Sequence, residues 1–241
     1  MSFAKSSESA WLKAPEERTI PAVDEVVVWR MSLADVDTAE SSILSRDEIE
    51  RADRLKFPEA RCAFIQGRLF LRRMLGRLLK RPPAGLAFAS EGNGKPVLAD
   101  GDLAFNLSHS GGEALLAVSG ASPVGVDIES IRPERDLIGL AKRYFAPTEV
   151  EELLRLPSDN QVLGFYTCWT RKEAFIKAIG EGLSHPLDSF AVNLTPGDAP
   201  TFRTPMPDWR VFNLELGERF AGAVVVPTAI QRLTCFQLES L

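Results

Sequence analysis

Gly125-Val126-Asp127-Ile128-Glu129 is the stretch that says most about the fold of this chain of 241 residues. Its alternation predicts a β-strand, in which successive side chains point to opposite faces of a sheet. Asp127 and Glu129 then share one face, and Val126 and Ile128 share the other. Two carboxylates side by side on a strand are hard oxygen ligands of the kind that a divalent cation prefers.

A second stretch, residues 169–177 (WTRKEAFIK), follows about forty residues later and predicts a helix on which Glu173 and Lys177 are neighbours. Its apolar residues fall on one stripe at the helical period, which consists of Phe165, Cys168, Trp169, Phe175, Ile176 and Ile179. Lys172 lies inside this stripe, where a lysine needs a charge partner or a path by which its ammonium reaches water. Two interpretations of Lys172 stay open at this point: a functional lysine, and a lysine whose stem packs in the core while its ammonium reaches water. Three converging carboxylates with two lysines beside them would hold a divalent cation and the phosphate groups that it bridges.

The composition, 45% hydrophobic and 25% charged, is typical of a soluble globular protein. No apolar run approaches the length of a membrane span, and residues 1–13 lack the apolar core of a secretory signal. Cys62, Cys168 and Cys235 form no CxxC or Cys/His cluster, which argues against a disulfide framework and a zinc site. We therefore expect a reduced, cytoplasmic setting and no membrane partner.

The net charge of −5 is distributed unevenly. Residues 51–81 contain ten lysines or arginines and two acidic residues, a balance of +8, which leaves −13 on the rest of the chain. Nucleic-acid binding favours a broad positive field, so a local basic stripe on an acidic protein argues against it. The stripe fits a compact polyanion, and a solvated, arginine-rich helix face is the alternative for most of its members.

Hydrophobic periodicity predicts strands that alternate with helices. Strands are expected at 26–31, 103–107, 114–118 and 124–129. The first expected helix covers 45–57, a longer second helix follows it to residue 80, and further helices are expected at 136–144, 148–156 and 161–179. The tail from residue 190 is expected to be largely β. Ser45 is the expected N-cap of the first helix, with Glu48 at the capping-box position.

A faint internal echo relates the two halves of the chain at an offset of 101 residues. The matching pairs include Glu48/Glu149, Leu55/Leu156 and Phe64/Phe165. We therefore predict an α+β fold of two similar α/β halves, a pseudo-two-fold duplication in which each small, mostly antiparallel sheet packs on a long helix. The expected halves are residues 1–121, with the nucleotide contacts, and 122–241, with the metal site and the catalytic helix, and a site lies where they meet.

The first half offers candidates for anion binding. Residues 106–112 (NLSHSGG) predict a strand that runs into a turn of small polar residues, where backbone N–H groups, Ser108 and His109 suit an anion. A histidine that is simply solvated in the turn is the alternative. Residues 93–96 (NGKP) predict a tight turn that presents Lys95.

These motifs, in this order and spacing, resemble the 4′-phosphopantetheinyl transferase superfamily. The resemblance covers roughly residues 44 to 195 and includes residues 180–183 (GEGL) and 186–190 (PLDSF) after the long helix. The length and the internal echo are similar to the monomeric, pseudo-dimeric type that activates carrier proteins of peptide and polyketide synthetases in secondary metabolite biosynthesis. The resemblance implies an enzyme that moves phosphopantetheine from coenzyme A to a serine of an apo acyl or peptidyl carrier protein and releases adenosine 3′,5′-bisphosphate.

The resemblance also implies roles for individual residues. Mg²⁺, which Mn²⁺ can replace, would be held by Asp127, Glu129 and Glu173 and would neutralise the pyrophosphate. Glu173 would also be the general base, while Lys172 and Lys177 would stabilise charge on the phosphoryl oxygens. The residues that match the family's nucleotide-phosphate contacts are Lys95, Ser108 and His109, with Arg51 as a further contact.

One position departs from the family pattern. Ala63 stands where relatives often carry a basic residue, and Arg61 is the candidate replacement. Two other classes stay open: a binding protein that sequesters coenzyme A or carriers without turnover, and a different Mg²⁺-dependent phosphoryl transferase with a convergent site. The motifs do not identify which carrier protein is used.

Overall fold

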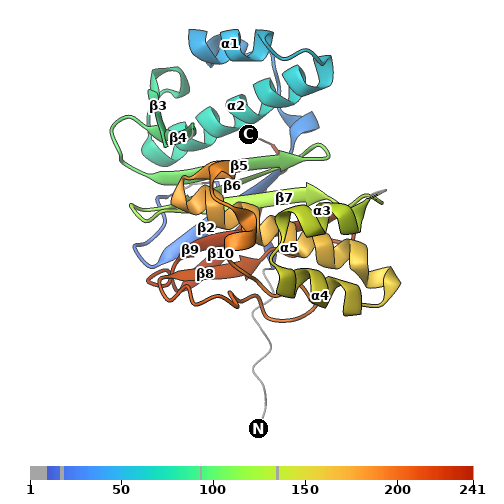
Figure 1. Cartoon of the computed structure of the whole chain (residues 1–241). Coiled ribbons are helices and arrows are strands. Elements are labelled where there is room, and N and C mark those ends of the chain that lie inside the picture. Colours follow the sequence, from blue (N-terminus) through green and yellow to red (C-terminus); the bar gives the residue numbers. More distant parts are fainter. Residues whose placement is uncertain (1–9, 17–18, 93, 134–135, 241) are drawn as a thin grey trace.

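The computed structural model describes residues 10–16, 19–92, 94–133 and 136–240, which form two sheets, a hairpin and five α-helices (Figure 1). The five-stranded sheet has the order β1-β10-β2-β6-β5, with bounds Trp11–Lys13, Arg232–Gln237, Glu25–Ser32, Glu113–Ser119 and Ala104–Ser110. The three-stranded sheet has the order β7-β9-β8, with bounds Gly125–Ser130, Phe220–Pro227 and Trp209–Asn213. The hairpin joins β3 (Phe88–Glu91) and β4 (Lys95–Leu98). The helices are α1 Arg46–Asp53, α2 Pro58–Leu79, α3 Leu137–Tyr144, α4 Pro147–Arg155 and α5 Ser158–Ile179.

The internal duplication is visible in the topology. In each sheet one strand pairs antiparallel with a neighbour on either side, β6 with β2 and β5, and β9 with β7 and β8. In each half a short helix precedes a long one, and both long helices have 22 residues. The predicted α+β fold of two similar halves, each a small sheet on a long helix, is confirmed.

The last strand crosses from one half to the other. β10, near the end of the chain, pairs in parallel with β2, and β1 pairs in parallel with β10. The first sheet is therefore completed by a segment that the sequence assigned to residues 122–241. The division of the chain at residue 121 stays a prediction.

Local signals explain where the helices begin and end. Ser45 caps α1: its hydroxyl accepts from the Glu48 N–H at 3.3 Å, and the Glu48 carboxylate accepts from the Ser45 N–H at 2.8 Å. This capping box confirms the predicted start of the helix. α2 begins at Pro58, where the missing N–H costs nothing, and ends at Leu79, after which Lys80 adopts a left-handed φ of 53°.

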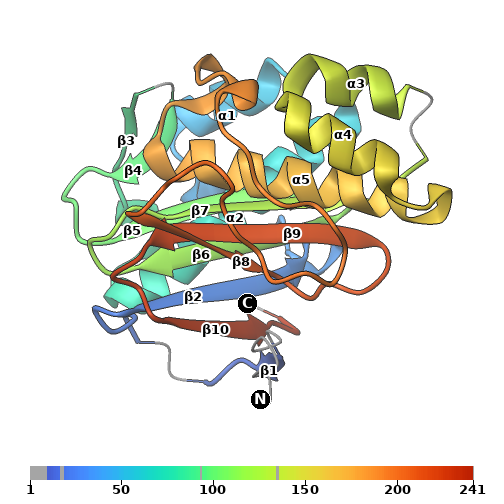
Figure 2. The same ribbon diagram turned by 60° about the horizontal axis from the view of Figure 1, so that its bottom comes forward.

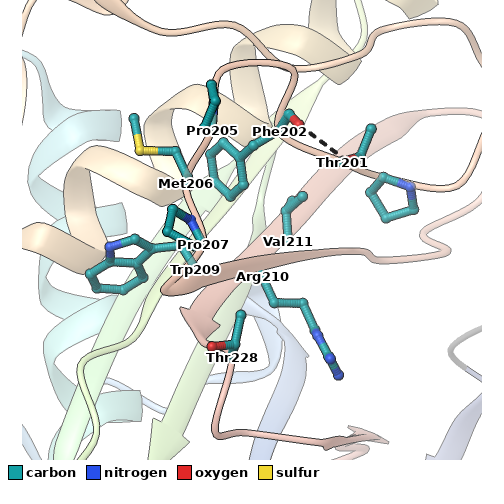
Figure 3. A pocket seen from close by; sticks show the side chains of 10 residues that line it. Thr201, Phe202, Pro205, Met206, Pro207, Trp209, Arg210, Val211 and Thr228 are labelled. Atoms are coloured by element: carbon teal, nitrogen blue, oxygen red, sulfur yellow. Dashed lines mark hydrogen bonds between the residues drawn. The ribbon is translucent and has the colours of Figure 1, made fainter.

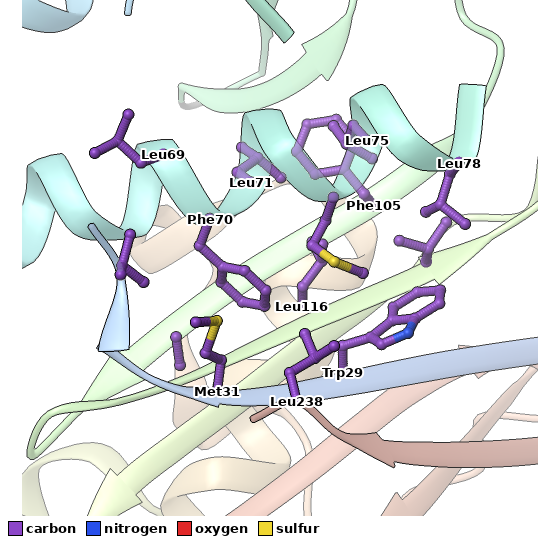
Figure 4. Close-up of a cluster of buried hydrophobic side chains, with 14 of the residues drawn as sticks. Trp29, Met31, Leu69, Phe70, Leu71, Leu75, Leu78, Phe105, Leu116 and Leu238 are labelled. Carbon is purple, nitrogen blue, oxygen red and sulfur yellow. The ribbon is translucent and has the colours of Figure 1, made fainter. Parts of the chain in front are cut away.

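Three apolar clusters lie between the successive layers of the fold, which are α2, the five-stranded sheet, the three-stranded sheet and α5. α2 packs on the outer face of the five-stranded sheet through residues such as Phe70, Leu75, Trp29 and Leu116 (Figure 4). α5 lies along β7 and β9 and covers the outer face of the three-stranded sheet (Figure 2). Between the sheets, the inner faces pack on each other. The cluster joins Val26, Val28, Leu115 and Ala117 of one sheet to Val126, Ile128, Val224 and Val226 of the other.

The two halves meet where β5 and β7 lie side by side, as both ribbon views show. This seam brings the polar residues of β5 next to the carboxylates of β7. None of the described helices combines the length and apolar character that a bilayer span requires.

Candidate active site

The strand β7 presents its two carboxylates to the seam, as the alternation predicts. Val126 and Ile128 are buried in the core between the sheets, at 0% and 1% exposure. Asp127 is 3% exposed and Glu129 is half-buried. Opposite them on β9 stand the small residues Ala223 and Ala221.

A glycine allows β7 to approach α5 closely. A Cβ atom at Gly125 would lie 2.0 Å from the Ala174 carbonyl oxygen and 2.4 Å from the Ala178 nitrogen. Only glycine leaves room for this approach, which brings the strand against the helix turn that carries Glu173 and Lys177. The Gly-x-Asp-x-Glu pattern therefore combines a packing requirement with two acidic side chains.

Lys177 and Glu173 join the carboxylates from the helix. The Lys177 Nζ donates to the Asp127 Oδ1 at 2.6 Å and to the Ser108 Oγ at 3.2 Å. Burial raises the pKa of Glu173 to about 7, and the charges of Asp127 and Glu129 raise it while Lys177 lowers it. The pKa of Glu129 is also raised, first by burial and second by the negative charge of Asp127. The structure thus brings together four of the predicted residues in one electrostatically coupled group.

The metal site itself is not formed as a ready cluster. Among the described residues, no three His, Cys, Asp or Glu side chains are gathered in an arrangement that could hold a metal ion. One observation does fit a cation: the Asp127 Oδ2 is buried and has no hydrogen-bond partner. A buried carboxylate oxygen without a partner is costly, and a cation would satisfy it. The group supplies oxygen atoms alone, which is the chemistry that Mg²⁺ prefers.

The structure does not bring Lys172 to this group. Its side chain is 0% exposed, and its Nζ pairs with the Glu149 carboxylate at 2.7 Å. The same ammonium donates to the Leu187 and Phe190 carbonyl oxygens at 2.7 and 2.6 Å. Three N–H groups and three acceptors leave nothing for a phosphate. These contacts give Lys172 a structural role in the core, and the catalytic role expected for it stays a prediction that none of its contacts supports.

The first half contains the counterpart of this buried pair. On α2, the Arg72 guanidinium donates to the Glu48 carboxylate at 2.7 Å and to the Pro83 and Leu86 carbonyl oxygens at 2.8 and 3.1 Å. Glu48 and Glu149 each also accept from the backbone N–H at the start of their own short helix. The long-helix cation, the short-helix glutamate and two carbonyls three residues apart recur in both halves. Such repetition indicates a device that anchors each long helix.

The candidates for nucleotide binding lie on several elements. β5 continues to Ser110, so Ser108 and His109 belong to a strand and not to the predicted turn. Ser108 Oγ donates to the Asp127 Oδ1 at 2.9 Å. His109 is exposed and faces α2 at Gly67, where a Cβ atom would lie 3.7 Å from its ring. Burial of part of the ring and the charge of Lys177 lower the pKa of His109.

Lys95 starts the strand β4 and is held inside the seam. Its Nζ donates to the Val124 and Ala178 carbonyl oxygens at 3.0 and 3.3 Å, and burial lowers its pKa. The expected tight turn includes Asn93, which lies outside the described residues. Lys95 therefore links β4 to the residue before β7 and to the end of α5, and does not stand at the tip of a turn.

The remaining basic candidates lie on α1 and the start of α2. The Arg51 guanidinium lies over the Phe64 ring, 5.5 Å from its centroid. Arg61 pairs with Asp53 at 2.9 Å, and Ala63 packs against the core. No contact of these side chains with the carboxylates of β7 is recorded among the described residues.

Two polar residues of the seam, Asn106 and Ser110, were not predicted as site residues from the sequence. Ser110 Oγ donates to the Glu129 Oε2 at 2.9 Å, and Asn106 Oδ1 accepts from the Val126 N–H at 2.8 Å. Their signal is the polar residue at every second position of a strand, 106, 108 and 110, which points one polar edge at a neighbour.

A separate apolar pocket of about 370 Å³ lies in the second half, between β8 and the segment before it (Figure 3). Phe202, Met206, Trp209 and Arg210 are among its lining residues. None of the predicted site residues contributes to that lining, so the pocket is distinct from the seam.

Comparison with known proteins agrees along both halves. The sequence profile of the 4′-phosphopantetheinyl transferase superfamily matches residues 123–225, and the profile "4′-phosphopantetheinyl transferase, N-terminal" matches residues 27–121. The chain is 39% identical over 229 residues to 4′-phosphopantetheinyl transferase HetI of Nostoc sp. (strain PCC 7120), covering 91% of this chain and 94% of that protein. It is 31% identical over 205 residues to 4′-phosphopantetheinyl transferase Sfp of Bacillus subtilis (strain 168), covering 83% of this chain and 90% of that protein.

Among solved structures, a holo-(acyl-carrier-protein) synthase from Bacillus anthracis in complex with CoA matches 44% of this chain and 94% of its own, at 22% identity and a TM-score of 0.38. The two profiles together span most of the described residues, and the match to HetI extends over nearly the whole of both proteins. The chain therefore belongs to the 4′-phosphopantetheinyl transferase superfamily and is a transferase enzyme.

Proposed function

We propose that the enzyme transfers the 4′-phosphopantetheine arm of coenzyme A to a serine of an apo acyl or peptidyl carrier protein, in a reaction that needs Mg²⁺ or Mn²⁺ and releases adenosine 3′,5′-bisphosphate. The observation that carries the proposal is the coupled group at the seam, in which Glu173 has a pKa of about 7 beside Asp127, Glu129 and Lys177. Perturbed carboxylates beside a lysine are typical of sites that move protons and phosphoryl groups. In this proposal the enzyme is a monomer that acts in the cytoplasm, in secondary metabolite biosynthesis. It binds neither nucleic acid nor a membrane.

Glu173 is the general base of the proposal. A pKa of about 7 lets its carboxylate accept a proton at neutral pH and release it again. It takes the proton of the serine hydroxyl as the serine oxygen bonds to the β-phosphorus of coenzyme A. The bond from that phosphorus to the bridging oxygen breaks, and adenosine 3′,5′-bisphosphate leaves with the electron pair.

The other residues of the seam manage charge. Asp127, Glu129 and Glu173 would hold Mg²⁺, which when bound supplies positive charge to the pyrophosphate. Lys177, whose ammonium already lies on the Asp127 carboxylate, stabilises negative charge on the phosphoryl oxygens. Its position inside a largely buried group strengthens this interaction, because water screens it less.

His109 is the proposed contact for the 3′-phosphate of coenzyme A. Its exposed ring lies on β5 close to Lys177, so an anion bound there would meet two cations once the imidazole is protonated. Lys95 has three N–H groups, of which two bind carbonyl oxygens, so the third can donate to a phosphate oxygen, and the Ser108 hydroxyl would do so by turning its hydrogen away from Asp127. We keep both, and Arg51, as further proposed nucleotide contacts.

Mass spectrometry of apo carrier proteins tests the proposal. The purified chain would be incubated with coenzyme A, Mg²⁺ and carriers of fatty-acid, polyketide and peptide-synthetase origin. We expect at least one carrier to gain the mass of phosphopantetheine, with stoichiometric adenosine 3′,5′-bisphosphate, and no gain when the acceptor serine of the carrier is replaced by alanine. Retention of coenzyme A without any carrier gaining mass would instead indicate a binding protein. Phosphoryl transfer to a different acceptor would indicate a convergent transferase.

A further inference from the structure

Three polar side chains of β5 hold the edge of β7. The Asn106 Oδ1 accepts from the Val126 N–H at 2.8 Å, the Ser108 Oγ from the Ile128 N–H at 3.4 Å, and the Ser110 Oγ from the Ser130 N–H at 3.1 Å. Each bonded pair is twenty residues apart in the sequence. The two strands therefore run in the same direction, and side-chain oxygens of β5 replace the carbonyl oxygens that a paired strand would offer.

This arrangement satisfies backbone groups that would otherwise be orphans. The other edge of β7 pairs with β9, so the N–H groups of Val126, Ile128 and Ser130 can only be satisfied from the β5 side. A side chain placed between two backbones also holds the strands further apart than a backbone ladder would. The seam between the halves therefore has room for polar side chains between β5 and β7, and the carboxylates of Asp127 and Glu129 receive hydrogen bonds there.

The two serines of this ladder also orient the carboxylates. A hydroxyl has one hydrogen to donate, and an N–H that binds its oxygen leaves that hydrogen pointing elsewhere. Ser108 donates its hydrogen to the Asp127 Oδ1 at 2.9 Å, and Ser110 donates to the Glu129 Oε2 at 2.9 Å. In both cases the receiving residue directly precedes the residue whose N–H binds the same serine.

We propose that Ser110 is a positioning residue of the transfer reaction, which fixes the Glu129 carboxylate in the orientation that receives the divalent cation. This inference rests on the proposed function, because it assigns Ser110 to the cation site of that reaction. Glu129 is half-buried and, among the described residues, Ser110 is its one recorded hydrogen-bond donor. Asp127, by contrast, is held by Ser108 and Lys177 together. Loss of one hydroxyl should therefore release Glu129 more completely than Asp127.

The backbone around Ser110 makes it a rigid support. It is the last residue of β5, and Gly111 follows with a φ of +58°. A Cβ atom at Gly111 would lie 2.8 Å from the Ser130 Cβ, so the turn is pressed against the end of β7. Only glycine fits this left-handed, crowded position, and it fixes the distance over which the Ser110 hydroxyl reaches Glu129.

The test compares Ser110→Ala with Ser110→Thr, which keeps the hydroxyl, and with Ser130→Ala as matched control. Ser130 contributes only its backbone N–H to the ladder, so its side chain can be removed without loss of a ladder oxygen. Binding of Mn²⁺ would be measured by electron paramagnetic resonance, with and without coenzyme A. Thermal melting would be recorded for every variant, and Ser110→Cys, whose thiol is a poorer donor, would replace Ser110→Ala if the latter does not fold.

Ser110→Ala should raise the Mn²⁺ dissociation constant roughly 10–100-fold, the usual effect of removing a residue that orients a metal ligand. Ser110→Thr and Ser130→Ala should bind Mn²⁺ as the wild type does. In the transfer assay, Ser110→Ala should raise the Mg²⁺ concentration for half-maximal rate much more than it lowers the rate at saturation.

Equal Mn²⁺ affinity of wild type and Ser110→Ala, or no Mn²⁺ binding by the wild type, would overturn the inference. A lower melting temperature with unchanged affinity would do the same, because it would show that the hydroxyl serves stability alone. A wild type that binds Mn²⁺ in a Ser110-dependent way and modifies no carrier would leave this inference standing and refute the proposed function. Carrier modification with Ser110-independent Mn²⁺ binding would support the proposed function and overturn the inference about Ser110.

Discussion

Replacing Glu173 by glutamine should make the enzyme both inactive and more stable. Burial, together with the charges of Asp127 and Glu129, raises the pKa of this carboxyl from 4.5 to about 7 in spite of Lys177. The folded protein therefore disfavours the ionised form relative to the unfolded chain. At about 1.4 kcal/mol for each pH unit, the rise corresponds to roughly 3 kcal/mol. This is an upper limit, since the side chain keeps some contact with water that screens its neighbours.

The pH dependence of this cost follows from the two pKa values. Below pH 4.5 the carboxyl is protonated in both the folded and the unfolded chain, and the cost is absent. Between pH 4.5 and 7 the unfolded chain loses its proton first, so the stability of the folded state falls as the pH rises, and above pH 7 the cost is complete. Glutamine stays neutral throughout. The variant should thus exceed the wild type by up to roughly 3 kcal/mol at pH 8, and by less than about 1 kcal/mol at pH 5.

Urea unfolding at pH 5 and pH 8, in the presence of EDTA, measures the free energy of unfolding of wild type and Glu173→Gln. Glu151→Gln is the matched control, because Glu151, like Glu173, lies four residues before a basic residue on its helix, and its pair with Arg155 is exposed. The control should change stability by only about 0.2–0.5 kcal/mol. The transfer assay should show a loss of about 10²–10⁴-fold for Glu173→Gln, the usual contribution of a general base.

Two results would refute this reasoning. If Glu173→Gln is less stable than the wild type at pH 8, Glu173 is no more than the surface partner of Lys177, and its ionised form is not disfavoured by burial. If Glu173→Gln retains the wild-type turnover number, Glu173 is not the base, whatever its effect on stability.

Further substitutions test the surrounding structure. Lys172→Met should cost about 3–5 kcal/mol of unfolding free energy because it removes the only cation that pairs with the Glu149 carboxylate among the described residues of the core, and adding Glu149→Gln should restore part of it; a folded Lys172→Met protein without transfer activity would return Lys172 to the catalytic group. Asp127→Ala should abolish transfer at saturating Mg²⁺ because it removes an oxygen ligand and a negative charge, an assignment that near-wild-type rates would rule out. His109→Ala should weaken binding of coenzyme A more than that of dephospho-coenzyme A, by roughly 1.5–3 kcal/mol in calorimetry, and equal losses would move His109 away from the 3′-phosphate. Gly125→Ala should lower the melting temperature strongly, because its Cβ would lie 2.0 Å from the Ala174 oxygen, and an unchanged melting temperature would contradict so close a contact between β7 and α5.

Much of the site follows from local periodicity. The two-residue period of β7 places Asp127 and Glu129 together because Val126 and Ile128 must be buried. The 3.6-residue period of α5 places Glu173 and Lys177 together. Caps and prolines set the helix starts, as at Ser45 and Pro58. These properties depend on residues a few positions apart, so the chain determines them without reference to its distant parts.

The role of Lys172 depended on the tertiary structure. The helical period shows that this lysine points into the core, and it does so at 0% exposure. The period says nothing of Glu149, on another helix, whose carboxylate pairs with the lysine in the core. A lysine in an apolar stripe and a catalytic lysine look the same until the partner is known.

Which strands lie next to each other also depended on the tertiary structure. β10 pairs with β2 across about two hundred residues, and β5 meets β7 through the side chains of Asn106, Ser108 and Ser110. A strand exposes the same N–H groups whichever segment covers them, so its own sequence cannot name its neighbour. The choice belongs to the packing of both sheets and both long helices at once. The sequence by itself therefore determined which side chains share a face, and the tertiary structure decided which of those faces meet.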